Sequence, residues 1–519
     1  MTRRQFIMAS AAGWAATLRP SALFSQKTAL PRDNPAAALQ IGWTNRLAWG
    51  RVLDVTTQPG TTWEQRLEAA QARLAAEGGG VVFFPPGEYV FTETLRLKSG
   101  IVIRGAAPPD GLRAVDQAYT LPTRFEFPRY RPKLEGSGTP IETAFRGIVL
   151  EDPATAANCG VVHVAFNHGH IHLGEGPQHR CGTNRLVLGC VLRNAARADP
   201  RVPDLALGQH AWQRFTHGHA PAISVHAAEN LLIAGNRLPA SDASFTMPGY
   251  VLKARQKGVA TVAYDVVFDY DNRPGIAANP ACVGAPGGQS GRGTPEQFPW
   301  GFRRGAVIRD NYVYCTGRTA IALTGDGTVC VNNVIRFPRD IWRPTNTGLH
   351  ETSGSSTNDN RAVEMRGWRW VVEGNDYEVW RNWAADRKYY INDGEGLMHE
   401  HHCNASIRDS RLVNNRGNAY LSLYLTEGID GLLVEGNEVA VDRGYAIFVN
   451  ANLSRQVPAP CRRVTIARNV TRGGGILIAG QPAGDNVVRD NRHLGPPAPL
   501  RNEAAAQLAD NENYEVVAG

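Results

Sequence analysis

The chain has 519 residues, and 43% of them are hydrophobic, so it can bury a large core, either as several domains or as one long repeat. The formal net charge is +7, and residues 1–26 carry three arginines and no acid, which leaves about +4 for the rest. No element carries a block of Lys and Arg, so the charge permits an anionic substrate but gives no reason to expect nucleic acid as a partner.

The N-terminus is typical of an export signal. The segment Thr2-Arg3-Arg4-Gln5-Phe6-Ile7 resembles a twin-arginine signal, and a short apolar stretch follows up to residue 18. This stretch is about half as long as a membrane-spanning helix. We therefore expect residues 1–26 to be removed and the protein to be periplasmic or extracellular. No later segment is long and apolar enough to span a bilayer, so no membrane association is expected after cleavage.

A helix and two strands are predicted next in the chain. Thr62 and Gln65 form a capping-box pattern, and apolar residues at helical spacing follow up to Leu74. Three glycines at 78–80 end this helix. A strand at 81–84, a Pro-Gly turn and a second strand through residue 91 follow. We expect the helix to cap one end of the fold.

A repeat occupies the larger part of the chain. Short, β-branched, alternating phrases end on an Asn, and the spacing of 22 residues between successive Asn occurs twice. The phrases end at Asn236, Asn311, Asn333, Asn375, Asn437, Asn469 and Asn491, and Ser410 is expected to replace Asn in one unit. A second phrase precedes the Asn phrase, at 222–225, 320–323, 362–365, 446–449 and 475–478.

A repeat of this length with two or three strands predicts one turn of a parallel β-helix per unit. Asn tolerates left-handed backbone angles at a tight turn, and stacked Asn side chains can hydrogen-bond along the axis. Eight cysteines are scattered without metal-type spacing. Some can pair in an exported protein, while Cys190 and Cys330 lie in apolar strand patterns that favour buried free thiols.

Residues 63–105 resemble the N-terminal start of the pectate-lyase-like superfamily. The resemblance rests on the helix, Gly-Gly-Gly, the apolar strand, Pro-Pro-Gly-x-Tyr, and Leu97-x-Ser99-Gly100-Ile101-x-Ile103-x-Gly105. It implies an all-β, right-handed parallel β-helix with an N-terminal amphipathic capping helix and inserted loops. The superfamily includes polysaccharide lyases, polygalacturonase-related glycoside hydrolases, epimerases and phage tailspikes. The chain lacks the paired-Asp and Gly-His-Gly pattern of polygalacturonases and the pectate lyase signature, so the resemblance does not select an activity.

The expected organisation has four parts. Residues 1–26 are the signal and 27–105 contain the cap and first strands. Residues 106–500 form the β-helix, with insertions at about 238–305 and 337–400, and residues 501–519 form a C-terminal tail.

Inward side chains of a β-helix form its core, so a ligand must meet outward positions or loops. Ile321 lies 12 residues before Asn333, and Val363 lies 12 before Asn375. This alignment predicts that Glu364 and Arg366 point outward. By the same reasoning Ser224 and His226 point outward, and an alignment on Ser410 turns Met398 and Glu400 outward.

The segment 342–403 departs most from a plain coil and is rich in aromatic and acidic residues. It contains five of the eleven tryptophans, at 342, 368, 370, 380 and 383. Aromatic faces stack on sugar rings, and a pair of carboxylates is what glycoside hydrolysis requires. The predicted catalytic residues are Asp393, Glu395 and Glu364. The predicted substrate-binding residues are Arg366, Trp368, Trp380, Glu400, His402 and His226.

Each of these residues has a structural alternative. Asp393 and Glu395 can simply shape a turn, and Glu364 can form an ion pair with Arg366. The run at 399–402 alternates between two faces and does not predict a zinc site. Asp326 is expected to be a turn residue aligned with Trp368. Asp269 and Asp271 suggest a second acidic patch, as a Ca²⁺ site, a sugar-binding edge or a solvated turn.

Three functions remain open from the sequence. The first is a glycoside hydrolase without cofactor or metal, acting as a monomer on a polysaccharide or oligosaccharide. The second is a lyase of a uronate polymer, which needs Ca²⁺ or Arg to neutralise the uronate and a base for the C5 proton, with Arg366, Arg318 and His402 as candidates. The third is a non-catalytic carbohydrate-binding protein.

Overall fold

The computed structural model describes most of the chain in seventeen segments. These are residues 30–108, 120–128, 147–173, 182–193, 222–226, 228–239, 244–252, 262–269, 276–279, 305–314, 319–336, 361–378, 398–400, 407–423, 428–441, 444–451 and 459–517. Three long parallel sheets, which we call A, B and C, and one two-stranded antiparallel hairpin account for the described strands.

The strands of the sheets have the following bounds. Sheet A contains β1 (Val52–Asp54), β2 (Gly80–Phe84), β5 (Ile101–Gly105), β8 (Ala157–Val162), β11 (Gly182–Leu188), β14 (Ala228–Ala234), β19 (Ala306–Arg309), β22 (Val329–Val331), β25 (Val371–Glu373), β28 (Ile407–Val413), β31 (Ile429–Glu435), β34 (Pro460–Ala467), β37 (Gln481–Pro482), β38 (Val487–Arg489) and β41 (Gln507–Ala509). Sheet B contains β3 (Gly87–Val90), β6 (Thr123–Glu126), β9 (Ala165–Asn167), β12 (Val191–Arg193), β15 (Arg237–Leu238), β20 (Tyr312–Tyr314), β23 (Val334–Arg336), β26 (Asp376–Glu378), β29 (Arg416–Gly417), β32 (Glu438–Ala440), β35 (Val470–Arg472) and β39 (Arg492–Leu494). Sheet C contains β4 (Leu95–Leu97), β7 (Gly147–Leu150), β10 (His170–Leu173), β13 (Ile223–His226), β18 (Ile276–Asn279), β21 (Thr319–Asp326), β24 (Arg361–Trp368), β27 (Met398–Glu400), β30 (Leu421–Leu423), β33 (Tyr445–Asn450), β36 (Gly475–Ala479), β40 (Ala498–Asn502) and β42 (Tyr514–Val517).

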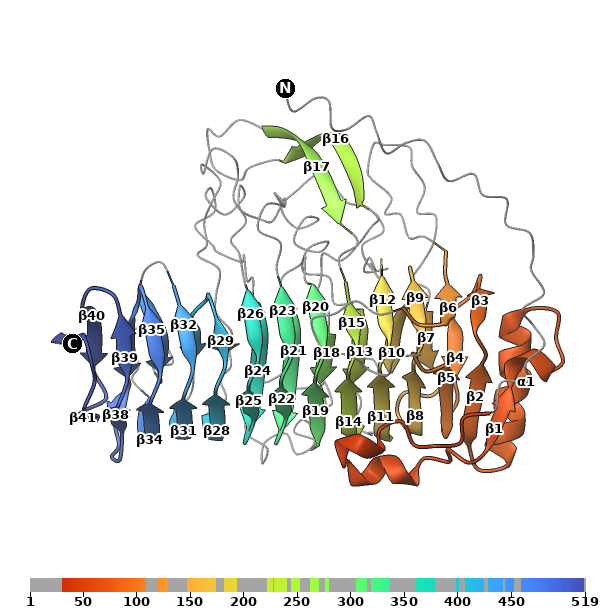
Figure 1. The fold of residues 1–519 in the computed structure, drawn as a ribbon, viewed down its shortest axis with the longest axis horizontal. Coiled ribbons are helices and arrows are strands. Elements are labelled where there is room, and N and C mark those ends of the chain that lie inside the picture. Colours follow the sequence, from red (N-terminus) through yellow and green to blue (C-terminus); the bar gives the residue numbers. More distant parts are fainter. Residues whose placement is uncertain are drawn as a thin grey trace.

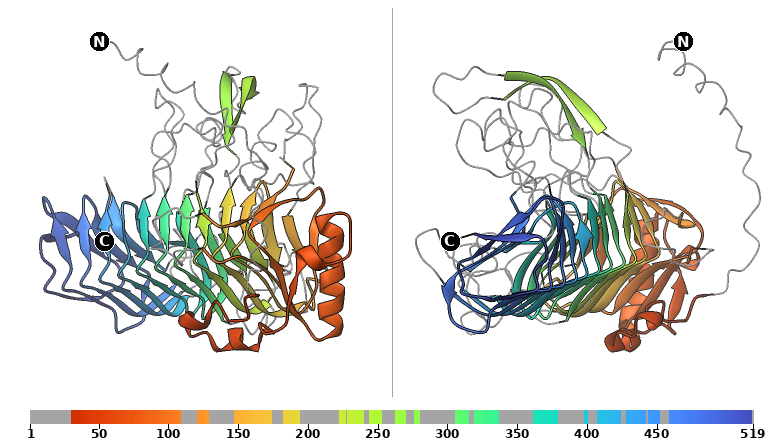
Figure 2. Two further views of the ribbon diagram at one scale, coloured as in Figure 1. Left: turned by 45° about the vertical axis from the view of Figure 1, so that its right-hand side comes forward. Right: turned by 60° about the vertical axis from the view of Figure 1, so that its left-hand side comes forward.

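The chain visits the sheets in the fixed order A, B, C, and then returns to A one strand further along. For example, β19 is followed by β20 and β21, and β22 then pairs with β19 in parallel. Figures 1 and 2 show the resulting stack, in which the three sheets surround a single core. The structure is therefore a right-handed parallel β-helix, as the repeat and the resemblance predicted.

The capping helix α1 (Trp63–Ala76) covers the first coil, at the right-hand end in Figure 1. Both halves of the predicted capping box form, because the Thr62 side chain accepts from the Gln65 backbone and the Gln65 side chain accepts in return. The glycines end the helix for a steric reason. Gly79 has φ of 99°, and a Cβ on it would lie 2.5 Å from the carbonyl oxygen of Gly100. The described helices include none with both the length and the apolar content to cross a bilayer.

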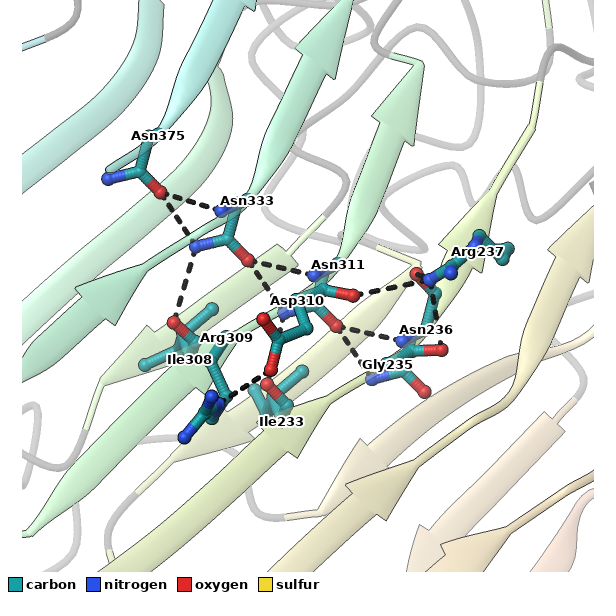
Figure 3. A network of polar contacts seen from close by, with 10 residues as sticks. All are labelled: Ile233, Gly235, Asn236, Arg237, Ile308, Arg309, Asp310, Asn311, Asn333 and Asn375. Atoms are coloured by element: carbon teal, nitrogen blue, oxygen red, sulfur yellow. Dashed lines mark hydrogen bonds and ion pairs between the residues drawn. The ribbon is translucent and has the colours of Figure 1, made fainter. Parts of the chain in front are cut away.

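An asparagine ladder runs along the corner between sheets A and B (Figure 3). The backbone N–H and Nδ2 of Asn311 both donate to Oδ1 of Asn333, at 3.1 and 2.9 Å, and Asn333 donates in the same way to Asn375. The second Nδ2 proton of Asn311 is given to the carbonyl of Ile233. The ladder consists of Asn236, Asn311, Asn333, Asn375, Asn415, Asn437, Asn469, Asn491 and Asn511.

Two details of the predicted ladder are wrong. Asn415, not Ser410, continues it, because Ser410 lies five residues earlier, inside β28, where it pairs with Leu432. The left-handed residue of each turn is also not the ladder Asn but the residue before it, such as Asp310 at φ 56° or Asn332 at φ 55°. Each turn thus separates the two tasks, with one residue reversing the chain and the next bonding along the axis.

The corner between sheets C and A has one left-handed residue in most coils. In three early coils this residue is Asn, and Asn230 and Asn184 each donate through Nδ2 to the Asn of the preceding coil, at 2.9 and 2.7 Å. In later coils the position is taken by Arg369 and Arg463, among others. The predicted tolerance of Asn for left-handed angles therefore applies at this corner.

The core contains free thiols and one unexpected tryptophan. Cys159, Cys190, Cys330 and Cys461 are buried and unpaired, which confirms the prediction for Cys190 and Cys330. Burial raises the pKa of the Cys330 thiol to about 12, so it stays protonated and unreactive. Trp370 is fully buried in the same core.

Residues 30–50, which we call the N-terminal strap, cover the outer face of sheet A across its first strands. The strap includes the short 3₁₀ helices η1 (Ala37–Leu39) and η2 (Gly42–Arg46), which Figure 1 shows beside β11 and β14; a third, η3 (Val55–Thr57), follows β1. It forms a second apolar cluster made of Ala36, Leu47 and Trp49 with Val81, Phe83, Val102, Val162, Leu186, Leu188, Leu232 and Ala234. Arg104 fastens the strap by donating to the Asp33 carbonyl and carboxylate, at 2.7 and 3.0 Å.

His163 lies beside this fastening, at the end of β8. It is 5% exposed, and neither ring nitrogen has a hydrogen-bond partner among the described residues. Burial, with the neighbouring Arg104 charge, lowers the pKa of His163 to about 4. The folded protein therefore holds this imidazole neutral.

Some predicted boundaries need correction. The insertion expected at 238–305 is interrupted, because Ile276–Asn279 forms β18 and continues sheet C between β13 and β21. β16 (Ser244–Leu252) and β17 (Val262–Asp269) form the hairpin, which contains Asp269; Asp271 lies outside the described residues. The region expected to be a tail carries β41 and β42, which pair with β38 and β40, so the β-helix extends to Val517.

The ladder predicts a large effect of a single amide. Asn333→Ala removes an acceptor shared by two donors of Asn311 and leaves buried groups unsatisfied, which should destabilise the fold by about 2–5 kcal/mol. Differential scanning calorimetry should show a lower Tm. Glu438→Ala, on the exposed side of sheet B, is the control and should change little. A wild-type Tm for Asn333→Ala would contradict the role of the ladder.

The neutral state of His163 predicts an acid-sensitive contribution to stability. An unfolded His binds a proton below about pH 6.5, whereas the folded state resists it until about pH 4, so stability is lost as the pH falls between these values. The loss amounts to about 3 kcal/mol. His163→Asn, which suits the left-handed φ of 55°, should flatten the dependence of Tm on pH in this range. His168→Asn, at another left-handed position, should keep the wild-type slope.

Candidate functional site

The outer face of sheet C carries two columns of residues in register. The strands alternate, and the inward positions Ile223, Ile321, Val363, Leu421 and Ile447 are at most 1% exposed. Column 1 lies between these inward positions and contains Val149, His172, Ser224, Ala277, Ala322, Glu364, His399, Ser422, Phe448, Leu477 and Arg501. Column 2 lies two residues further along and contains His226, Asn279, Thr324 and Arg366.

The structure brings three predicted site residues onto this face. Glu364 pairs with Ala322, and Arg366 pairs with Thr324, which confirms the register derived from the Asn spacing. His226 lies three strands from Arg366 in column 2, or about 14 Å along the axis at the usual strand spacing. Glu364 and Arg366 are therefore neighbours on one strand, while His226 lies some coils away.

The expected alignment of β27 was wrong. Val363 pairs with Met398, and Met398 pairs with Leu421, so Met398 and Glu400 share the inward positions and His399 takes the place in column 1 beside Glu364. The error follows from the misplaced anchor at Ser410. Glu400 stays a predicted substrate-binding residue only as a member of β27.

Several predicted residues lie outside the described part of the chain. These are Asp393, Glu395, Trp380 and His402, together with Trp342, Trp383 and Arg318. Their roles stay predictions. The chain position of Asp393 and Glu395, three to five residues before Met398, attaches them to the strand that pairs beside Glu364.

Trp368 is packed against an arginine at the corner between sheets C and A. Its side chain is 3% exposed, and the guanidinium carbon of Arg408 lies 3.8 Å from a ring centroid. This ring therefore serves as packing in the structure, and its predicted contact with a substrate stays untested. Trp370 belongs to the core, so two of the five tryptophans in the segment are not open surface.

Asp326 is more than the turn residue that the sequence indicated. It pairs with Trp368 in register, as predicted, but it is 3% exposed and forms an ion pair with Arg369 of the next coil. Asp326, Trp368, Arg369 and Arg408 thus form one cluster at the end of β21 and β24. It fixes the end of the strand that carries Glu364 and Arg366.

The sequence reasoning also missed two histidines of β10. His170 and His172 flank the inward residue Ile171, their ring centroids lie 4.8 Å apart, and both are 1% exposed. His172 belongs to column 1, four strands from Glu364. The alternation His170-Ile171-His172-Leu173 was the signal that could have identified them.

The other two outer faces offer less to a ligand. On sheet B the charges pair across coils, as in Arg124 with Glu88 at 2.7 Å and Arg416 with Asp376 at 2.6 Å. Burial alone would raise the pKa of Asp376, but hydrogen bonds from Arg416 and Arg336 hold it below its usual value. Sheet A is covered by the N-terminal strap over its first strands. Sheet C is therefore the favoured face for a site.

A protein metal centre has no counterpart in the described segments, where no group of three or more His, Cys, Asp or Glu is arranged to hold an ion. The expected absence of a metal remains a prediction for the chain as a whole.

The packing of Trp368 predicts a structural cost. Trp368→Ala should create a cavity under Arg408 and destabilise the protein by about 3–5 kcal/mol, whereas removal of an exposed sugar platform would cost little. Thermal unfolding monitored by near-ultraviolet circular dichroism measures this. An unchanged Tm would show that the ring does not pack as described.

Comparison with known proteins bears on the fold alone. No protein-family model and no curated protein sequence matches the chain. Among solved structures, the A-module of mannuronan C-5 epimerase AlgE6 from Azotobacter vinelandii is similar, with 11% identity over 90% of this chain and 99% of that one, at a TM-score of 0.42. PfbA, a surface adhesin of Streptococcus pneumoniae, has 11% identity over 90% and 91%, at 0.43. A tailspike protein mutant of E. coli bacteriophage HK620, solved with a pentasaccharide, has 12% identity over 89% and 64%, at 0.37. By the parallel order of its own sheets, the chain is a right-handed parallel β-helix protein, the architecture that its resemblance to the pectate-lyase-like superfamily implied.

Proposed function

We propose that the protein is an exported carbohydrate-active enzyme that cleaves a polysaccharide or oligosaccharide on the outer face of sheet C. The observation that carries this proposal is the register of β24. It sets Glu364 and Arg366 side by side on the face that is neither covered by the strap nor neutralised by paired charges. Residues 1–26 support the export, to the periplasm or beyond, and recovery of the mature chain outside the cytoplasm would test it.

Hydrolysis needs two carboxyl groups across the scissile bond. Glu364 supplies one, and Asp393 or Glu395 supplies the other, because the segment that contains them leads directly into β27, which pairs with β24. One carboxylic acid protonates the glycosidic oxygen, and the other attacks the anomeric carbon or activates water. Arg366, one pleat from Glu364, binds hydroxyl or carboxylate oxygens and keeps the neighbouring carboxyl ionised in its resting state.

A lyase is the second candidate, and the position of His399 favours it. His399 lies beside Glu364 in column 1, and Arg366 lies two residues from Glu364, so a base and a cation come from adjacent strands. In this reaction Arg366, with Ca²⁺ if one binds, neutralises the uronate carboxylate, and a base such as His399 or His402 removes the C5 proton. Loss of the C4 oxygen substituent then leaves a double bond in the product.

Substitution of the three carboxylates tests the proposal. Glu364→Gln, Asp393→Asn and Glu395→Gln should each reduce turnover by about 10²–10⁴-fold while substrate binding survives, because each change removes a proton-transfer group and keeps its shape. The assay offers plant, algal and bacterial polysaccharides and measures both reducing ends and absorbance near 235 nm.

Glu373→Gln is the matched control, since Glu373 is a half-buried carboxylate on the outer face of sheet A. It should leave turnover unchanged. Reducing ends without absorbance identify a hydrolase, and absorbance identifies a lyase. Wild-type turnover in all three carboxylate variants would refute the site, and a glycan that binds without any product would indicate a binding protein instead.

A further inference from the structure

The outer face of sheet C continues beyond the candidate site into coils whose side chains are described. After His399, column 1 passes through Ser422, Phe448 and Leu477 to Arg501. Phe448 is half-buried on β33, and the Tyr445 ring lies 6.2 Å from it at an interplanar angle of 44°. This face therefore presents an angled pair of aromatic rings in line with Glu364.

Polar groups border the two rings. Ser422 lies beside Phe448 on the preceding strand, and Asn450 lies two residues further along the same strand as Phe448. On the other side Arg501 forms an ion pair with Glu503, and a hydrogen bond joins it to Tyr445. Because Arg501 is already balanced by Glu503, the surroundings offer hydrogen bonds to hydroxyl groups rather than a net charge.

We propose that Tyr445 and Phe448 form a saccharide subsite that binds a pyranose ring of the substrate about three units away from the scissile bond. The apolar C–H face of a pyranose stacks on an aromatic ring, while its equatorial hydroxyls reach the surrounding polar groups. The proposal rests on the proposed function, because it takes Glu364 as the position of bond cleavage.

Strand spacing sets the distance. From Glu364 on β24 to Phe448 on β33 there are three strand intervals, or about 14 Å. A pyranose in an extended chain is about as long as one such interval. The substrate is therefore a polymer or long oligomer that lies along the axis of the β-helix, and chains shorter than about four units do not reach the subsite.

Affinity electrophoresis in native gels containing pectate, alginate, xylan or dextran tests binding without requiring turnover. At least one of these polysaccharides should retard the wild-type protein, and Phe448→Ala and Tyr445→Ala should each raise the apparent Kd about three- to tenfold. Phe448→Trp, which keeps a ring, should restore retardation. Tyr312→Ala, at a half-buried aromatic residue on β20 of sheet B, should behave as the wild type.

Two outcomes would overturn the subsite. One is that none of the four polysaccharides retards the wild-type protein, and the other is that Phe448→Ala, with a wild-type Tm, is retarded as strongly as the wild type. If Phe448→Ala lowers the Tm, the Phe448→Trp variant decides, because restored folding without restored binding also refutes the subsite.

The proposed function can fail separately. Retardation that depends on Phe448, without reducing ends or absorbance near 235 nm from any polysaccharide, would refute the enzyme and keep the subsite. Turnover that Phe448→Ala leaves unchanged on long and short chains would refute the subsite and keep the enzyme.

Discussion

The asparagine ladder ties each coil to the next through side chains rather than through strand pairing alone. Each buried amide accepts two hydrogen bonds from the preceding coil and donates to a strand carbonyl, so its polar capacity is satisfied inside an apolar core. A slip of one residue at this corner would break all of these bonds and also turn every apolar residue outward. The ladder therefore sets the register, and the register determines which residues occupy the two columns on sheet C.

The three outer faces of the β-helix are treated differently. An unmodified face would expose rows of valine and leucine, and sheet A solves this with the strap, which adds a second apolar cluster to the core. Sheet B is made polar by charges that pair from coil to coil, as in Arg336 with Asp376. Sheet C combines an acid, an arginine, histidines and aromatic rings. A carbohydrate, which has both apolar faces and hydroxyl edges, matches that mixture better than it matches either of the other faces.

Local patterns in the sequence predicted the parts of the fold that local physics determines. The capping box at Thr62, the Asn phrases and the equal spacing from Ile321 and Val363 to their ladder residues all led to correct registers. The failures occurred where two patterns look alike. Ser410 and Asn415 both follow an apolar phrase, and only the bond from Asn375 to Asn415 distinguishes them. That single choice moved Met398 by one position.

Tertiary context decided what the sequence could not. Trp368 and Trp370 look alike in a segment rich in aromatic residues, yet one lies under Arg408 and the other fills the core. The strap has no periodic pattern, so nothing local indicated that it lies on sheet A. The site itself was predicted in part, since Glu364 and Arg366 follow from register, whereas the aromatic pair at Tyr445 and Phe448 required the pairing of β30, β33 and β36.

The strap also has a consequence for the order in which the protein folds. Leu30 and Trp43 belong to an apolar cluster whose other members include Leu232, Ala234 and, at its margin, Val307. Residues that leave the ribosome among the first therefore find their full binding surface only after more than half of the chain has been synthesised. Until then the outer face of the early strands of sheet A is bare, and it is exposed to wrong partners for as long as synthesis takes. The first part of the described chain is in this sense the last to settle, and its docking marks the point at which the N-terminal half is complete.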